Sequence, residues 1–195
     1  MSPAISESYP TIAGNFCIES TELEGAFLIT PKVYKDRRGH LFERYNRRMF
    51  TEAGIDIEFV QDNQTESCRG TLRGMHYQAP PCAQAKLVYV VQGKIFDVIV
   101  DIRTESVTYG RWKGVTVSGE NKTMLFVPTG FAHGFCVLSA SAVVEYKCSD
   151  FYNPEAERGF RWDDPSLSID WPVKDPILSA KDRNAPTFAE LGSEF

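Results

Sequence analysis

The feature that most constrains this fold is a long series of short strand-like segments with turn residues between them. Segments rich in Val, Ile, Phe, Tyr and Thr recur roughly every 8–14 residues and are separated by Gly, Pro, Asn or Asp. Only residues 47–54 have the pattern of a short helix, which Gly54 would end. Because helices do not alternate with the strands, the pattern predicts an all-β sandwich or barrel with short peripheral helices. The predicted strands are residues 26–34, 41–46, 57–63, 71–78, 85–92, 94–102, 111–118, 123–128, 134–139 and 142–152.

The domain organisation follows from the length of the chain and from where this pattern starts. A chain of 195 residues suits one compact domain. Residues 1–24 are polar and lack periodicity, so we expect a flexible N-terminal extension or arm that forms a strand only if another segment pairs with it, with order beginning near Gly25. Residues 25–195 then form a single domain. The segment after residue 153 is rich in Pro and Asp, and we expect it to wrap around the barrel as loops and short helical turns.

Charge and cysteine content exclude several classes of protein. The chain has 21 Lys and Arg against 26 Asp and Glu, a formal net charge of −5. A general nucleic-acid binder needs a surplus of basic residues, so this partner is not expected. No run of about 18 apolar residues occurs and the first residues lack a signal pattern, so no membrane partner is expected either. Five cysteines without a C-x-x-C pair predict reduced thiols in a cytoplasmic protein.

Two of the three histidines stand in patterns that resemble the two motifs of the cupin barrel. Five residues separate Gly70 from His76, as at the start of the first motif, and Pro128, Gly130 and His133 have the spacing of the second. The alternative for each histidine is a hydrogen-bonded structural residue. The two motifs together predict a cupin-like jelly-roll barrel.

The metal-ligand set of the cupins is incomplete in this chain. Metal-binding cupins carry a second histidine two positions after the first and a glutamate a little later, where this sequence has Gln78 and Lys86. An ammonium has no lone pair for a metal and repels a dication. His76 and His133 alone fall short of the three or four ligands that metal sites usually have. The sequence therefore predicts no metal and no cofactor.

A histidine and a lysine in the mouth of a barrel suit proton abstraction next to a carbonyl. A neutral imidazole, here His76, can remove the proton, and the ammonium of Lys86 can stabilise the enolate oxygen that forms. An acid must return the proton, and Tyr146 is the candidate because a phenol is neutral at pH 7. The alternative for Tyr146 is a tyrosine that only packs in the core.

Ten stretches between residues 25 and 188 carry a more specific resemblance. They are D-R-R-G-H-L-F-E (36–43), F-V-Q-D-N (59–63), R-G-T-L-R-G-M-H-Y-Q (69–78), A-Q-A-K-L-V (83–88), G-K-I-F-D-V-I-V-D-I-R (93–103), Y-G-R-W (109–112), P-T-G-F-A-H-G-F (128–135), E-Y-K-C-S-D-F-Y (145–152), D-D-P-S-L-S-I-D-W-P (163–172) and L-S-A-K-D-R (178–183). In this order they resemble the dTDP-4-dehydrorhamnose 3,5-epimerase family, cofactor-free sugar-nucleotide epimerases with a cupin-like jelly roll.

The resemblance implies a role for individual residues. The base that removes the protons at C3 and C5, both α to the C4 ketone, matches His76, and Asp182 matches the carboxylate that orients it. Lys86 matches the ammonium that stabilises the enolate, and Tyr146 matches the opposing acid. The implied substrate contacts are Arg38, Glu43, Gln61, Asn63, Arg73, Glu157 and Lys181 for the nucleotide and pyrophosphate, Tyr152 for stacking on the thymine, and His133 as the buried histidine of the second motif.

The implied activity is inversion of C3 and C5 of dTDP-4-keto-6-deoxy-D-glucose to give dTDP-4-keto-L-rhamnose, in a homodimer whose early strands exchange between subunits. Three alternatives remain open at this point: a mono-epimerase acting at C3 or C5 only, a metal-dependent cupin enzyme, and a non-catalytic sugar-nucleotide binding module. The placement of Arg73 and His76 is also open. Strict strand alternation puts them on opposite faces, so either Gly74 marks a bulge or the two side chains reach the site from different directions.

Overall fold

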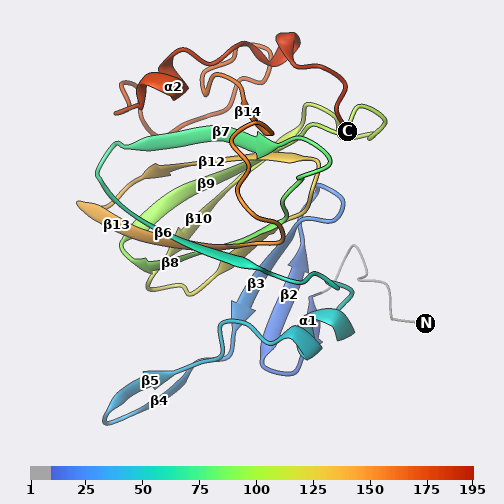
Figure 1. Ribbon diagram of the computed structural model, residues 1–195. Helices are drawn as coiled ribbons and strands as arrows, with labels where there is room; N and C mark the ends of the chain where they lie inside the picture. Colours follow the sequence, from blue (N-terminus) through green and yellow to red (C-terminus); the bar gives the residue numbers. More distant parts are fainter. Residues whose placement is uncertain (1–9) are drawn as a thin grey trace.

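The computed structural model describes residues 10–195, which form two antiparallel β-sheets around a common core (Figure 1). The larger sheet has seven strands in the order β1 (Thr11–Ala13), β2 (Phe16–Ser20), β3 (Phe27–Pro31), β11 (Met124–Val127), β8 (Lys86–Gln92), β13 (Ser141–Cys148) and β6 (Gln61–Cys68). The smaller sheet has five strands in the order β10 (Trp112–Ser118), β9 (Lys94–Asp101), β12 (Phe131–Val137), β7 (Leu72–Gln78) and β14 (Glu157–Gly159).

The remaining elements are short and lie around the two sheets. A hairpin of β4 (Tyr34–Asp36) and β5 (Gly39–Leu41) projects away from the barrel (Figure 1). The helices are α1 (Arg47–Glu52), α2 (Ala180–Arg183) and the 3₁₀ turn η1 (Phe188–Glu190). The prediction of an all-β, cupin-like jelly roll with short peripheral helices is confirmed. None of the helices between residues 10 and 195 has the length and apolar character needed to span a bilayer, and all five cysteines are free.

Alternating side chains divide the core into three layers. The central layer lies between the sheets and includes Val88, Ile99 and Phe135. A second layer lies between the outer face of the larger sheet and α1, around Phe50. A third lies between the outer face of the smaller sheet and the C-terminal segment, around Phe160. The segment after residue 153 therefore covers the smaller sheet, as Figure 1 shows for α2 above β7.

Several predicted boundaries are wrong. Order begins before Gly25, because β1 and β2 pair with each other and β2 pairs with β3. Only two alternating apolar residues, Phe16 and Ile18, mark β2, and its strand conformation depends on that long-range pairing. Residues 1–9 lie outside the described residues, so the division into an extension and a domain stays a prediction. The predicted strand at 41–46 stops at Leu41, and the one at 57–63 starts only at Gln61.

Of the two alternatives left open for Arg73 and His76, the structure shows an irregularity at Gly74, between β7 and β12. His76 pairs with His133 and Arg73 pairs with Phe135. Between these two pairs β7 advances by three residues and β12 by two, so β7 contains one extra residue. Gly74 and Gly134 face each other so closely that a Cβ on Gly74 would lie 2.5 Å from the Cα of Gly134. The extra residue changes the alternation along β7 and brings Arg73 and His76 to the same cavity.

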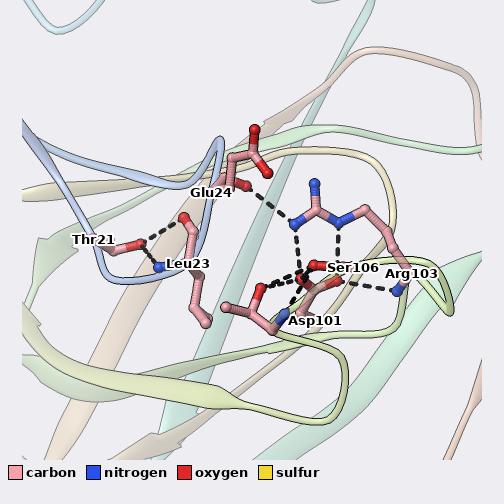
Figure 2. Close-up of polar contacts among 7 residues, drawn as sticks. Thr21, Leu23, Glu24, Asp101, Arg103 and Ser106 are labelled. Carbon is pink, nitrogen blue, oxygen red and sulfur yellow. Dashed lines mark hydrogen bonds and ion pairs between the residues drawn. The ribbon is translucent and has the colours of Figure 1, made fainter. Parts of the chain in front are cut away.

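A buried carboxylate, Asp101, fastens the segment before β3 to the end of β9 (Figure 2). Its oxygens accept hydrogen bonds from Arg103 Nε and Nη2 at 2.9 and 2.7 Å, and from the hydroxyls of Ser106 and Thr108. Arg103 Nη2 also donates to the carbonyl of Glu24. Burial raises the pKa of Asp101, but these hydrogen bonds outweigh burial and lower the pKa to about 2.

We predict that Asp101→Asn lowers the free energy of unfolding at pH 7 by roughly 2 kcal/mol. The pKa of Asp101 is lowered on folding, so its stabilisation is complete above its ordinary value of 3.8 and is lost as the pH falls towards about 2. Urea unfolding at pH 7 and near pH 2.5 measures both effects. Asp163→Asn, in an exposed pair with Arg161, is the control and should cost less than about 1 kcal/mol. The prediction would be contradicted if Asp101→Asn had the same free energy of unfolding as the wild type at pH 7. It would also be contradicted if the difference between them were no smaller near pH 2.5.

Candidate active site

The candidate site is a pair of adjoining cavities between the two sheets. The larger has a volume of about 260 Å³ and the smaller about 110 Å³. His76, Lys86, Tyr146 and Glu157 border both. The larger is also lined by Thr65, Arg73, His133, Phe135, Ser179, Lys181 and Asp182, and the smaller by Gln61, Asn63, Tyr77, Gln78, Gln84 and Tyr152.

His76 and Asp182 form a hydrogen-bonded pair on the side of the smaller sheet. His76 Nε2 lies 2.5 Å from Asp182 Oδ1, and Asp182 is only 4% exposed. Asp182 is held in turn by Ser179, the N-cap of α2, whose hydroxyl accepts from the Asp182 N–H at 3.0 Å. Burial raises the pKa of Asp182, but the hydrogen bonds with His76 and Ser179 outweigh burial and keep its pKa below the ordinary value. The ionised carboxylate fixes the imidazole ring and leaves its second nitrogen free for chemistry.

Lys86 and Tyr146 come from neighbouring strands of the larger sheet. Lys86 on β8 pairs with Cys148 on β13, and Tyr146 lies two residues before Cys148 on the same strand. Burial lowers the pKa of the Lys86 ammonium, and the negative charges of Glu157 and Asp97 partly offset this. Burial also raises the pKa of the Tyr146 phenol, which keeps it protonated at neutral pH. The cavity thus has a histidine from one sheet and an acid and a cation from the other.

A second histidine–carboxylate pair lies deeper in the barrel. His133 Nε2 is 2.6 Å from Asp97 Oδ1, and both residues are buried. His133 borders the larger cavity and is the cross-strand neighbour of His76. Over residues 10–195, no three His, Cys, Asp or Glu side chains gather in a group that could hold a metal ion.

Glu157 organises the polar residues at the mouth of the cavities. Its carboxylate lies 2.5 Å from Lys181 Nζ and accepts a hydrogen bond of 2.9 Å from the Tyr152 hydroxyl. Burial raises the pKa of Glu157, but the hydrogen bonds with Lys181 and Tyr152 and the charge of Lys181 outweigh burial and lower the pKa. Arg73 borders the larger cavity from β7, where its Nε donates to Ser67 Oγ at 3.1 Å.

Two predicted site residues do not reach the cavities within one chain. Arg38 stands at the tip of the β4–β5 hairpin, where its side chain is 85% exposed and pairs with Asp36. Glu43 follows the hairpin and accepts hydrogen bonds from Asn15 and Asn46. The structure brings the other eleven predicted site residues together around the two cavities.

The sequence analysis missed several residues that build the site. Asp97 could have been singled out from the sequence, because it is a charged residue inside the apolar strand K-I-F-D-V-I-V-D. Ser179 had a weaker signal, since a serine three residues before Asp182 has the spacing of a helix N-cap. Thr65, Gln84 and Phe135 had no signal, because only the meeting of the sheets makes them line a cavity.

Comparison with known proteins identifies the same family that the motifs indicate. A family model described as dTDP-4-dehydrorhamnose 3,5-epimerase matches residues 20–190. The dTDP-4-dehydrorhamnose 3,5-epimerase of Shigella flexneri is 51% identical over 171 residues, which are 87% of this chain and 94% of the relative.

Solved structures agree with this match. The dTDP-6-deoxy-D-glucose-3,5-epimerase of Legionella pneumophila, in complex with dTDP-4-keto-L-rhamnose, is 46% identical with a TM-score of 0.88, over 92% of this chain and 96% of its own. ChmJ, a 3'-monoepimerase from Streptomyces bikiniensis in complex with dTDP-quinovose, is 38% identical with a TM-score of 0.83, over 87% of this chain and 86% of its own. Because sequence and structure match over most of both chains, this chain belongs to the dTDP-4-dehydrorhamnose 3,5-epimerase family.

Proposed function

We propose that this chain is an isomerase that converts dTDP-4-keto-6-deoxy-D-glucose into dTDP-4-keto-L-rhamnose by inverting C3 and C5. The observation that carries the proposal is the arrangement of one cavity: His76 with Asp182 on the smaller sheet, and Lys86 with Tyr146 on the larger. A binding module has no need of a matched base and acid on opposite walls.

The proposed reaction is a proton transfer through an enolate. The free ring nitrogen of His76 takes the proton from C3 or C5, and the electron pair of the broken C–H bond moves to form an enolate at the C4 oxygen. The ammonium of Lys86 stabilises that oxygen, since charge interactions are strong in a buried site. Tyr146 then gives its proton to the opposite face of the same carbon, which inverts it. Asp182 holds the imidazole and stabilises the imidazolium that forms.

The rest of the site suits a nucleoside diphosphate. Arg73 and Lys181 supply positive charge for the pyrophosphate. Gln61, Asn63 and Tyr152 border the smaller cavity, and we assign them to the nucleoside, with Tyr152 stacked on the thymine. His133, fixed by Asp97, contacts the substrate from the floor of the larger cavity.

We also propose that the active protein is a homodimer in the cytoplasm. Arg38 and Glu43 have no access to the cavities of their own chain, so we infer that the β4–β5 hairpin carries them to the site of a second copy. The cytoplasmic location is supported by the five free cysteines. The net charge of −5 argues against nucleic acid as a partner.

A mono-epimerase is the second candidate, because the 38% identical relative ChmJ is a 3'-monoepimerase. Both activities need the same base and acid, so only the product separates them. We predict that proton NMR of dTDP-4-keto-6-deoxyglucose with the protein in D₂O shows deuterium at both C3 and C5. Deuterium at one carbon only would identify the mono-epimerase. Exchange that stops in the presence of EDTA would favour the metal-dependent alternative.

His76→Asn should abolish deuterium exchange at both carbons, because it removes the base. The loss should be at least about 10³-fold, while the Kd for dTDP stays nearly unchanged. Calorimetric titration with dTDP provides the binding control. Exchange at the wild-type rate in this variant would eliminate His76 as the base.

Tyr146→Phe should separate exchange from inversion. His76 can still remove a proton and return deuterium to the same face, so exchange continues, but one or both inversions fail because no acid faces the other side. A coupled reductase that traps the L-configured product measures the inversion. Tyr45→Phe, outside the cavity in the layer beneath α1, is the matched control. Normal product formation by Tyr146→Phe would remove its role as the acid.

Mixed dimers test the hairpin. His76→Asn and Arg38→Ala subunits should each be nearly inactive alone. A heterodimer of the two has one site with intact His76 that receives an intact Arg38 from the other subunit. Random mixing should therefore restore about a quarter of wild-type activity, since half of the dimers have one complete site of two. No recovery in a mixture shown to contain heterodimers would contradict the exchange of hairpins.

A further inference from the structure

Gln78 is a buried polar residue beside the proposed site, and the mechanism gives it no role. It follows His76 by two positions on β7, where metal-binding cupins carry a second histidine, and it is only 5% exposed. It borders the smaller cavity. A buried amide costs free energy unless its polar atoms are paired, so its partners show what this residue holds in place.

The hydrogen bonds of Gln78 go to the backbone on both sides of Tyr152. Its Nε2 donates to the carbonyl oxygens of Cys82 at 2.7 Å and Phe151 at 3.2 Å. Its Oε1 accepts from the N–H of Asn153 at 2.8 Å. The side chain therefore uses its amide group to hold the residues before and after Tyr152.

Two further glutamines bind the same loop. Gln61 Oε1 accepts from the N–H of Tyr152 at 2.9 Å, and Gln84 Nε2 donates to the carbonyl of Asp150 at 2.7 Å. Each of the four residues 150–153 thus has a backbone group bonded to a glutamine side chain. We call Gln61, Gln78 and Gln84 the glutamine clamp.

The loop needs such a clamp because packing does not hold it. Phe151 is 64% exposed and Tyr152 is 55% exposed, so neither ring is fixed by burial. Hydrogen bonds to the loop backbone, together with the bond from the Tyr152 hydroxyl to Glu157, define where the ring stands. A ring already in place costs less entropy on binding than one that must be ordered by the ligand.

We propose that Gln78 is a positioning residue that holds loop 150–153 and so presents Tyr152 to the base of the nucleotide. This inference rests on the proposed function, in which Tyr152 stacks on the thymine. The three hydrogen bonds of Gln78 all go to backbone groups, and none of these groups belongs to His76, Lys86, Tyr146 or Asp182. Gln78 therefore acts on nucleotide binding and leaves the proton transfers unchanged.

Gln78→Met keeps the size of the side chain and removes its hydrogen bonds. Gln92→Met, at the exposed end of β8, is the matched control. Three measurements apply to both variants and the wild type: the Kd for dTDP, the kcat and KM for the 4-keto sugar nucleotide, and hydrogen–deuterium exchange of residues 150–153 without ligand. For Gln78→Met we expect Kd and KM to rise roughly tenfold with kcat within about twofold, and faster exchange in the loop. Gln92→Met should match the wild type.

The inference would be overturned if folded Gln78→Met showed unchanged Kd, unchanged KM and unchanged amide hydrogen–deuterium exchange in loop 150–153. A fall in kcat at constant KM would overturn it as well. If Gln78→Met does not fold, Gln84→Met tests the clamp through its single bond to the Asp150 carbonyl. Gln84→Met should speed amide hydrogen–deuterium exchange in loop 150–153 and raise the Kd for dTDP by a smaller factor than Gln78→Met. Wild-type values of both would overturn the inference. A wild-type protein that neither binds dTDP nor exchanges protons would instead overturn the proposed function, and the inference with it.

Discussion

The close contact between β7 and β12 is the constraint on which the site depends. Two glycines, Gly74 and Gly134, face each other across these strands with no room for a Cβ. The extra residue on β7 at this point breaks the strict alternation of side chains, so Arg73 and His76 line one cavity. The same pairing sets His133 beside His76, each with its own buried carboxylate. A single local irregularity in one strand pair therefore collects the proposed base, His76, and two proposed binding residues, Arg73 and His133.

The two sheets divide the chemistry between them. The smaller sheet and the segment that covers it hold the proposed base His76 and its carboxylate Asp182, while Lys86 and Tyr146 project from the larger sheet. In the proposed reaction, a proton removed on one wall and returned from the other inverts the carbon. Burial between the sheets disfavours the charged form of both groups: it lowers the pKa of Lys86 and raises that of Tyr146, so the phenol stays neutral and keeps a proton to give.

Segments outside the barrel complete the site, and polar contacts hold the side chains that these segments bring to it. Ser179 caps the four-residue helix that carries Asp182, and Glu157 joins Lys181 to Tyr152. The glutamine clamp holds loop 150–153 in the same manner. At the other end of the chain, Asp101 and Arg103 fasten the segment before β3, from which the projecting hairpin follows. In the proposed function, both the barrel strands and these hydrogen-bonded segments contribute residues to catalysis and to nucleotide binding.

The sequence by itself determined the all-β class, most strand positions from β7 to β13, the short helix α1 and the two cupin-like motifs that carry His76 and His133, because periodicity and motif spacing are local properties of a chain. It placed the start of order too late and misjudged β5 and β6, since β2 and the edges of β6 depend on partners far away in sequence. It could name Asp182 as the partner of His76 only through a family resemblance, because 106 positions separate the two residues. Only the tertiary structure decided that Arg73 joins His76, that Asp97 supports His133 and that Arg38 lies away from its own cavity. These facts depend on how strands cross and how sheets face each other, which no local pattern encodes.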